Sequence, residues 1–415
     1  MSRHDPRQFI EDLRNHLAAP DRTIGFLFGA GTSSSINVAP PPRPGEKLAF
    51  TPLIPGTAGL TKQCEEAISE LGPPFDAAWN MLVEPSGPQE DPANIEGILT
   101  DVRTKLDAIG DGESLIGLDG SQLRHLEGLI CDSIADAVDP SDQAIPDHTP
   151  HDDFASWLRN SRRTIPVEVF TRNYDILIER ALERARVPLY DAFVGMHRPF
   201  FYPESLDDDR ELPPATWVRL WKLHGSVNWA TEEHEGGVRV VRGREEGDRA
   251  VILPSHRKYD ESRKQPYVAY MDRLHKVLNS EHSLLITCGY SFGDEHINGI
   301  LFGALDARPT ANVVALCYDP LDEKGQLLAA ARRRTNLSVA GPARAVISGE
   351  PAEWQLTQPV DGRTAGFMDI AFDSNASPDD EGSPASSGDD LSGCFRLGDF
   401  NWLCRFLTSL DRIPK

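Results

Sequence analysis

The chain has 415 residues, of which 40% are hydrophobic, and a formal net charge of −22 at pH 7. Taking about 100–200 residues per domain, this length predicts two or three compact units. The acidic balance argues against direct nucleic-acid binding by this chain alone, because phosphate contacts need clustered Lys and Arg. No apolar run approaches the ~20 residues that a membrane helix needs, so we expect no membrane partner.

The cysteines are scattered along the sequence, and none of the 6 belongs to a CxxC pair. Cys288 and Cys317 lie in apolar runs typical of strands, which favours small buried residues in a reducing compartment. The N-terminal stretch 1–20 is charged and has the spacing of an amphipathic helix, unlike a secretion signal. These features predict a soluble, cytoplasmic protein.

The N-terminal part begins with a clear strand signal, the apolar run 23–28, which ends in a glycine turn at 29–33. A Pro/Gly-rich stretch at 37–60 then shows little periodicity, and a loop of that length is uncommon unless it is functional or disordered. Over residues 61–139 apolar side chains recur at three- and four-residue steps. That spacing predicts helices with one buried face.

From residue 167 onward, strand patterns alternate with helix patterns. Four apolar runs predict strands, at 167–170, 217–223, 283–288 and 312–317. A helix is expected at 176–184, and residues 230–252 are typical of a polar hairpin insertion. Such alternation favours right-handed crossovers. The predicted fold class is therefore α/β, with a Rossmann-like parallel sheet, helices on both of its faces and a helical insert.

The predicted elements divide the chain into five parts. We expect an N-terminal helix and the start of the core in residues 1–60, a helical insert subdomain in 61–150, and the remainder of the core in 151–345. Residues 373–393 are rich in Ser, Asp, Gly and Pro and hold acids but no base, which predicts a disordered acidic linker. Residues 394–415 regain helical spacing and predict a helix that docks on the core or on a partner.

Polar clusters follow the carboxyl ends of the predicted strands, where open parallel sheets bind their ligands. The first cluster is the turn formed by Gly29, Ala30, Gly31, Thr32 and Ser33. Its glycines let the backbone approach a pyrophosphate, and its amides and hydroxyls can donate to one. A tight turn needed only for packing explains so short a pattern about equally well.

The second cluster is the loop 171–175, in which Asn173 can hold a ribose hydroxyl or a water and Asp175 can orient it. In isolation, ordinary loop capping explains this Asn and Asp better. The third cluster places His224 directly after a strand, and histidine is the natural general base near neutral pH. Because the chain has 12 histidines, a structural histidine is the default for any single one.

The fourth cluster spans residues 289–298 and begins as a second glycine turn after a buried strand, with Gly289, Tyr290 and Ser291. Ser291 can contact a phosphate or a ribose, whereas Asp294 can cap the helix that follows. Asp319 ends the next strand as an acidic residue. His148 and His151 fall in a predicted loop without helical spacing, so we expect no metal site.

The order of these clusters resembles the sirtuin (silent information regulator two) superfamily, whose turns begin Gly-Ala-Gly and whose core carries a Thr-x-Asn-x-Asp loop and a His-Gly pair. Several stretches look like its bacterial antiphage-defence branch: Phe-Thr-Arg-Asn-Tyr-Asp at 170–175, Lys-Leu-His-Gly-Ser at 222–226, Ile-Leu-Pro at 252–254 and Gly-Tyr-Ser-Phe-Gly-Asp-Glu-His-Ile-Asn at 289–298. In layout the chain resembles the sirtuin-like subunit that pairs with a HerA-type hexameric ATPase. The resemblance covers roughly residues 20–330.

The resemblance implies an NAD+ glycohydrolase, for which NAD+ is the substrate, acting in antiphage defence by abortive NAD+ depletion. It implies a homo-oligomer and a HerA-type ATPase partner. Asn173 and His224 would be catalytic, with Asp175 as the orienting residue. Asp319 would accept the adenosine-side hydroxyls. The remaining NAD+ contacts would come from Gly29, Ala30, Gly31, Thr32, Ser33, Gly289, Tyr290 and Ser291.

The chain also departs from the superfamily in ways that bear on its activity. Deacetylating sirtuins carry a zinc module with two CxxC pairs, which are absent here, so we expect no zinc. The loop after Ser33 lacks their Gly-Ile-Pro-Asp-Phe-Arg sequence. Both absences favour a hydrolase. The alternatives are an NAD-dependent protein deacylase or ADP-ribosyltransferase, and a non-catalytic sensor or scaffold that binds NAD+ or ADP-ribose.

Overall fold

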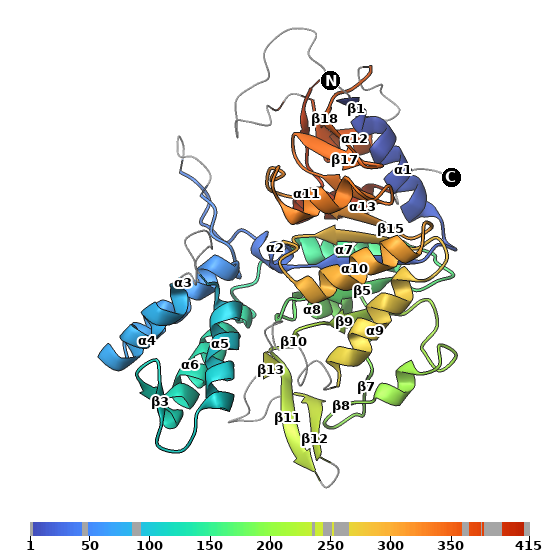
Figure 1. Cartoon of the computed structure of the whole chain (residues 1–415). Helices are drawn as coiled ribbons and strands as arrows, with labels where there is room; N and C mark the ends of the chain where they lie inside the picture. The colour runs from blue at the N-terminus through green and yellow to red at the C-terminus, as the bar shows by residue number, and fades with distance from the viewer. Residues whose placement is uncertain are drawn as a thin grey trace.

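A ten-stranded sheet runs through the centre of the fold, in the order β1-β18-β17-β16-β15-β14-β2-β5-β9-β6 (Figure 1). The computed structural model describes residues 3–43, 49–84, 93–234, 237–243, 251–252, 265–358, 365–374, 376 and 392–410. The central strands are β2 (Ile24–Phe28), β5 (Glu168–Thr171), β9 (Val218–Lys222), β14 (Leu284–Cys288) and β15 (Asn312–Leu316). They pair in parallel, which confirms the predicted α/β class.

The sheet extends at one edge through strands that the sequence pattern did not predict. They are β16 (Leu337–Ala340), β17 (Arg344–Ile347), β18 (Glu350–Trp354) and β1 (Arg3–His4). The pairs β16–β17 and β17–β18 are antiparallel, and β1 joins β18 in parallel. At the opposite edge, β6 (Leu189–Tyr190) pairs with β9 in parallel. The sheet is therefore mixed at one edge and parallel at its centre.

The centre of the sheet is covered on both faces, and strand β2 shows why its sequence is continuously apolar. Every residue of β2 is buried. Successive side chains of a strand point to opposite faces, so Phe26 packs into one hydrophobic cluster and Leu27 into another. A strand that is buried on both faces needs apolar residues at consecutive positions, as parallel strands typically have.

Helices cover both faces, as the Rossmann-like prediction requires (Figure 1). One face packs against α1 (Pro6–Ala18), α7 (Pro150–Asn160), α8 (Leu177–Arg184), α12 (Ala365–Ala371) and α13 (Phe400–Leu410). The other face packs against α9 (Tyr267–Leu278), α10 (Glu295–Ala307) and α11 (Gln326–Ala331). The short helix α2 (Ala30–Ser34) follows β2 directly.

The C-terminal helix α13 is part of the core. Phe400 and Phe406 are buried, and the Phe400 ring lies 5.1 Å from that of Phe28 on β2. Most of the predicted acidic linker lies outside the described residues. At its two ends, β19 (Phe372–Asp373) and β20 (Cys394–Phe395) pair in antiparallel fashion. This pairing places the start of α13 beside the rest of the core.

Helices between β2 and α7 form a separate cluster beside the sheet (Figure 1). They are α3 (Thr57–Ser69), α4 (Pro73–Val83), α5 (Ile95–Ala108) and α6 (Gly120–Val138), with the small strands β3 (Ser114–Leu115) and β4 (Leu118–Asp119). This helical insert shares its hydrophobic core with Tyr174, Leu177 and Val227 of the sheet domain. The division of the chain into domains stays a prediction.

The predicted polar hairpin is present as β11 (Trp229–His234) and β12 (Gly237–Arg242). It forms a small sheet with β7 (Phe193–Val194) and β8 (Phe200–Phe201). Close by in sequence are the strand pair β10 (Gly225–Ser226) and β13 (Val251–Ile252), and the 3-10 helix η1 (Pro203–Leu206). None of the helices in the described ranges combines the length and apolarity needed to cross a bilayer.

Candidate functional site

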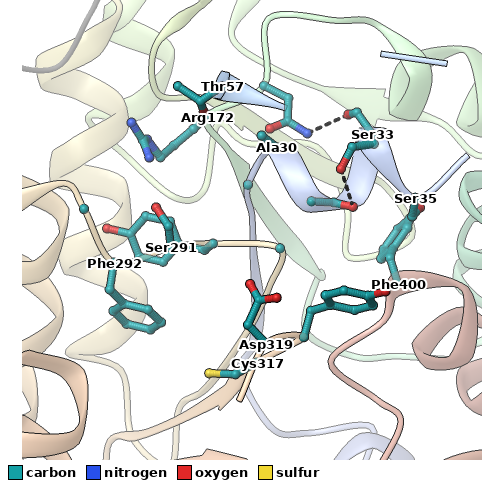
Figure 2. Close-up of a pocket in the computed structure, with 18 of the residues that line it drawn as sticks. Ala30, Ser33, Ser35, Thr57, Arg172, Ser291, Phe292, Cys317, Asp319 and Phe400 are labelled. Carbon is teal, nitrogen blue, oxygen red and sulfur yellow. Dashed lines mark hydrogen bonds between the residues drawn. The ribbon is translucent and has the colours of Figure 1, made fainter. Parts of the chain in front are cut away.

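A cavity of about 1000 Å³ opens at the carboxyl ends of the central strands. Its walls come from the segments after β2, β5, β14 and β15, from the helical insert and from the start of α13. Figure 2 shows Arg172 and Ser291 on one side, Ser33 on the other, and Asp319 with Phe400 at one end. The structure thus brings three of the four predicted clusters and Asp319 to one cavity, whereas His224 lies behind its wall.

The two glycine turns pack directly against each other. The amides of Gly29 and Gly31 donate to the carbonyl oxygens of Cys288 and Gly289, at 3.2 and 3.1 Å. A Cβ atom on Gly31 would lie 2.6 Å from the Cα atom of Gly289. Gly289 has a φ of +65°, and a Cβ there would lie 2.6 Å from the Thr32 nitrogen. Close backbone packing therefore requires glycine at these positions.

This packing changes what the first turn can offer to a ligand. Because the amides of Gly29 and Gly31 already donate to backbone carbonyls, they are not free donors for a pyrophosphate. Gly29, Ala30, Gly31 and Ser33 line the cavity, whereas Thr32 is buried beneath the turn. The turn thus supplies a wall without bulky side chains.

The side-chain amide of Asn173 is oriented by two hydroxyl groups of α2. Its Nδ2 atom donates to Thr32 Oγ1 at 3.0 Å and to Ser33 Oγ at 2.8 Å. Thr32 in turn donates to the carbonyl of Gly29, and Ser33 donates to Asp175 Oδ2 at 2.6 Å. Both hydroxyls therefore accept from Asn173, so the amide presents Oδ1 as its remaining acceptor.

A buried lysine fixes the loop that carries Asn173. Lys222, at the end of β9, donates to the carbonyl oxygens of Tyr174 and Asp175 and pairs with Glu179 Oε1 at 2.9 Å. Lys222 is 2% exposed. A buried ammonium needs such partners, because an unpaired charge in the interior is costly. The loop after β5 is thereby tied to the neighbouring strand and to α8.

His224 is buried one side chain behind the cavity wall and is 3% exposed. Its Nε2 atom lies 3.1 Å from Asp294 Oδ2 and 3.4 Å from Arg172 Nε. Arg172 lines the cavity and pairs with Glu96 Oε2 at 2.7 Å. Glu96 comes from α5 in the helical insert. Access from the cavity to His224 therefore passes Arg172 and Glu96.

The charges around His224 shift its pKa and that of its partner Asp294. Burial alone would raise the pKa of Asp294, but the hydrogen bond and charge of His224 and the charge of Arg172 hold it well below its usual range. Burial and the Arg172 charge lower the pKa of His224, against the opposing effects of Asp294 and Glu96.

The sequence interpretation missed Arg172, and it missed Glu96 as well. Arg172 stands within the predicted loop 171–175, so its place beside Asn173 was a usable signal. Glu96 gave no signal, because only the folding of the insert brings α5 to the loop after β5. Asp294 does cap α10 as expected, accepting from the amides of His296 and Ile297, and it also holds His224.

The far end of the cavity is formed by the loop after β15 and by residues 398–401. Asp319 is exposed there, as a contact with ligand hydroxyls requires. Gly398 packs so closely that a Cβ atom would lie 2.0 Å from the Cys317 carbonyl oxygen. Tyr290 also lines the cavity, with its hydroxyl donating to Asn298 at 2.9 Å, and Ser291 is exposed.

Of the two histidines considered for a metal, only His151 is placed differently from expectation. His151 lies in α7 and is buried against Phe400, so the predicted loop is wrong at this position. A proline at the start of α7 and a capping box at Thr149 explain the helix. His148 is exposed and lies 3.1 Å from Asp153. Across the residues that the structure describes, no group of three or more His, Cys, Asp or Glu could hold a metal.

Comparison with known families agrees with this geometry. A family model described as the SIR2-like domain matches residues 167–336. The matched segment contains Asn173, Asp175 and His224, as well as the second glycine turn. This similarity relates the segment to NAD-utilising proteins in general. No curated protein matches the chain significantly.

Proposed function

We propose that the protein is an NAD+ glycohydrolase that cleaves the nicotinamide–ribose bond and releases nicotinamide and ADP-ribose. The observation that carries this proposal is the oriented amide of Asn173, in one cavity with both glycine turns and Asp319. A volume of about 1000 Å³ is ample for a dinucleotide. The similarity of residues 167–336 to SIR2-like domains supports NAD+ as the substrate.

Cleavage of the nicotinamide–ribose bond needs little help from a general acid. Nicotinamide in NAD+ is a cationic pyridinium, so the electron pair of the breaking C1′–N bond neutralises the leaving group. A water oxygen then bonds to C1′, and a base takes its proton. The barrier arises from the oxocarbenium character of the ribose, which a site lowers through positioning and oriented dipoles.

Each site residue has a role in this proposal. Oδ1 of Asn173 orients the water or the ribose, and Asp175 fixes that amide through Ser33. His224 is the base. Asp319 accepts the adenosine-side hydroxyls. The pyrophosphate and ribose would lie along the two glycine turns, in contact with Gly29, Ala30, Gly31, Ser33, Gly289, Tyr290 and Ser291, while the buried Thr32 supports Asn173 from behind.

Purified protein incubated with NAD+ alone tests the proposal, with nicotinamide measured by chromatography. Asn173→Ala and His224→Ala should each abolish its release while leaving the thermal unfolding transition in place. His148→Ala, which removes an exposed histidine, is the matched control. Undiminished release by His224→Ala would refute the assignment of the base.

Added acceptors separate the rival activities. A deacylase or ADP-ribosyltransferase would release nicotinamide only with an acyl-lysine peptide or an acceptor protein. A sensor or scaffold would bind NAD+ without turnover. Release from NAD+ and water alone is the result that the hydrolase proposal requires, and ADP-ribose should appear in equal amount.

For the cellular role we propose antiphage defence by NAD+ depletion. An enzyme that destroys NAD+ must be restrained at rest, and we propose a homo-oligomer with a HerA-type ATPase partner as the restraint. Cellular NAD+ should fall on phage infection when the wild-type chain is present and stay level with Asn173→Ala. An unchanged NAD+ level in both strains would contradict the defence role and would leave the hydrolase proposal unaffected.

A further inference from the structure

Glu96 belongs to the helical insert, outside the segment similar to SIR2-like domains, yet its carboxylate lines the cavity. It lies in the first turn of α5. The side chain of Asn94 caps this turn by accepting from the amides of Glu96 and Gly97, both at 3.1 Å. Ile95 beside it is buried in the core of the insert. The backbone at Glu96 is therefore held firmly by the insert.

Arg172 connects this carboxylate to the interior. Its Nη2 atom donates to Glu96 at 2.7 Å, and its Nε atom lies 3.9 Å from Asp294 Oδ2. The guanidinium carbon also lies 5.8 Å from the centre of the Tyr290 ring. Arg172 is thus fixed between two acids from different parts of the chain, and its side chain covers His224.

The second nitrogen of His224 has no hydrogen-bond partner among the described residues, although it is fully buried. Glu96 Oε1 is 4.0 Å from this Nδ1 atom. An unpaired buried polar atom costs free energy, so the acid that faces it bears on how the imidazole is held. Nδ1 therefore faces the acid at the cavity wall.

We propose that Glu96 is a positioning residue for His224, holding Arg172 with one carboxylate oxygen and facing Nδ1 with the other. The helical insert then completes the site, because it supplies one of the charged groups that face His224. This inference rests on the proposed function where it treats His224 as the base. The contacts of Glu96 stand independently of turnover.

Three charged groups face His224, each from a different element. Glu96 comes from α5, Arg172 from the loop after β5, and Asp294 from the N-cap of α10. The two acids raise the pKa of His224, and Arg172 lowers it. Removing Glu96 should therefore lower the pKa of His224 further, whereas removing Arg172 should raise it. The two variants should therefore shift the pKa of His224 in opposite directions, because they remove opposite charges.

The first experiment follows His224 itself, by NMR of the full-length protein with labelled histidine, assigned with His224→Gln. Glu96→Gln should move the ionisation of His224 to lower pH, and Arg172→Gln should move it to higher pH. Asp101→Asn is the matched control, because Asp101 lies on α5 in an exposed pair with Lys105. Shifts of the same sign, no shift, or an equal shift with the control would overturn the proposal.

The second experiment measures nicotinamide release against pH. The base must be neutral, so the acidic limb of kcat/KM should follow His224, to lower pH in Glu96→Gln and to higher pH in Arg172→Gln. We expect kcat at the optimum to fall on the order of tenfold or more in Glu96→Gln, because the base loses its position. An unmoved limb in an active enzyme would overturn the positioning role.

The two proposals fail in different ways. A wild-type protein that releases no nicotinamide contradicts the proposed function, and the NMR titration still decides whether Glu96 controls His224. Nicotinamide release with an unresponsive His224 leaves the hydrolase intact and removes the role of Glu96. Thermal unfolding of each variant, measured beside Asp101→Asn, identifies a loss of activity that is caused by unfolding.

Discussion

Replacing Ser33 with alanine removes the hydroxyl that joins Asp175 to Asn173. That hydroxyl donates to Asp175 Oδ2 at 2.6 Å and accepts from Asn173 Nδ2 at 2.8 Å. Both Ser33 and Asp175 are buried, although they line the cavity, so little water can replace the lost donor. Asp175 keeps the amide of Leu177, at 3.0 Å on its other oxygen. Ser33→Ala therefore leaves a buried acid with one donor fewer.

Hydrogen bonds to charged groups contribute about 1.5–3 kcal/mol, and the neutral bond to Asn173 adds about 1 kcal/mol. We expect the free energy of unfolding to fall by about 3 kcal/mol in Ser33→Ala. The amide of Asn173 also loses one of its two anchors, and small displacements of a catalytic group cost on the order of 10²-fold in rate. Urea unfolding and nicotinamide release measure the two effects.

Ser280→Ala is the matched control, since this serine, beyond the end of α9, donates to the nearby carbonyl of Lys276 and is remote from the cavity. The free energy of unfolding of Ser280→Ala should lie within about 0.5 kcal/mol of the wild-type value. The reasoning is refuted if Ser33→Ala unfolds at the wild-type urea concentration and releases nicotinamide at the wild-type rate. Loss of activity with wild-type stability would point to the Asn173 contact alone.

Three further changes test the framework of the site. Lys222→Met leaves Glu179 and the carbonyl of Asp175 without their buried cation, and should lower the free energy of unfolding by about 3 kcal/mol in urea. Gly289→Ala places a Cβ 2.6 Å from a backbone nitrogen at a φ of +65°, and should lower the thermal midpoint and nicotinamide release together. Burial lowers the pKa of His151 to about 4. In the unfolded chain His151 therefore takes up a proton below about pH 6.5, whereas in the native state it stays neutral down to about pH 4. The stability that comes from burying the neutral His151 is complete above about pH 6.5 and declines as the pH falls towards 4. His151→Phe should unfold with a weaker pH dependence in that window, measured by urea titration at several pH values.

The convergence of the loops could be predicted from the sequence because parallel strands have their carboxyl ends on one edge. Strands such as β2 and β14 can be predicted from their apolar runs, because a strand that is buried on both faces needs apolar residues at consecutive positions. The order of the strands in the sheet could not be predicted from the sequence. His224 follows β9, which lies beyond β5 from the two glycine turns, and this extra step places the imidazole behind Arg172.

Contacts between distant parts of the chain could not be predicted. Arg172 and Glu96 are 76 residues apart in sequence, and they meet only because the insert docks on Tyr174 and Leu177. Periodicity identifies the helices of the insert but not the surface on which they pack. The edge strands β16 to β18 were missed for a related reason, since short strands with mixed polarity lack a distinctive pattern.

The glycines of the first turn show how one pattern can serve two purposes. Their spacing was read as a pyrophosphate turn or a packing turn, and the structure gives close packing between Gly31 and Gly289 as a sufficient reason for them. The same contact brings both turns to the cavity. A short glycine motif therefore predicts where a site lies better than it predicts which hydrogen-bond donors the site offers.

The last helix of the described chain supplies both a part of the core and one end of the cavity, through residues 398–401. During synthesis, the strands of the central sheet and the loops that line the cavity after β2, β5, β14 and β15 emerge from the ribosome before α13 does. The pocket therefore stays open at that end until α13 has emerged and packed beside β2.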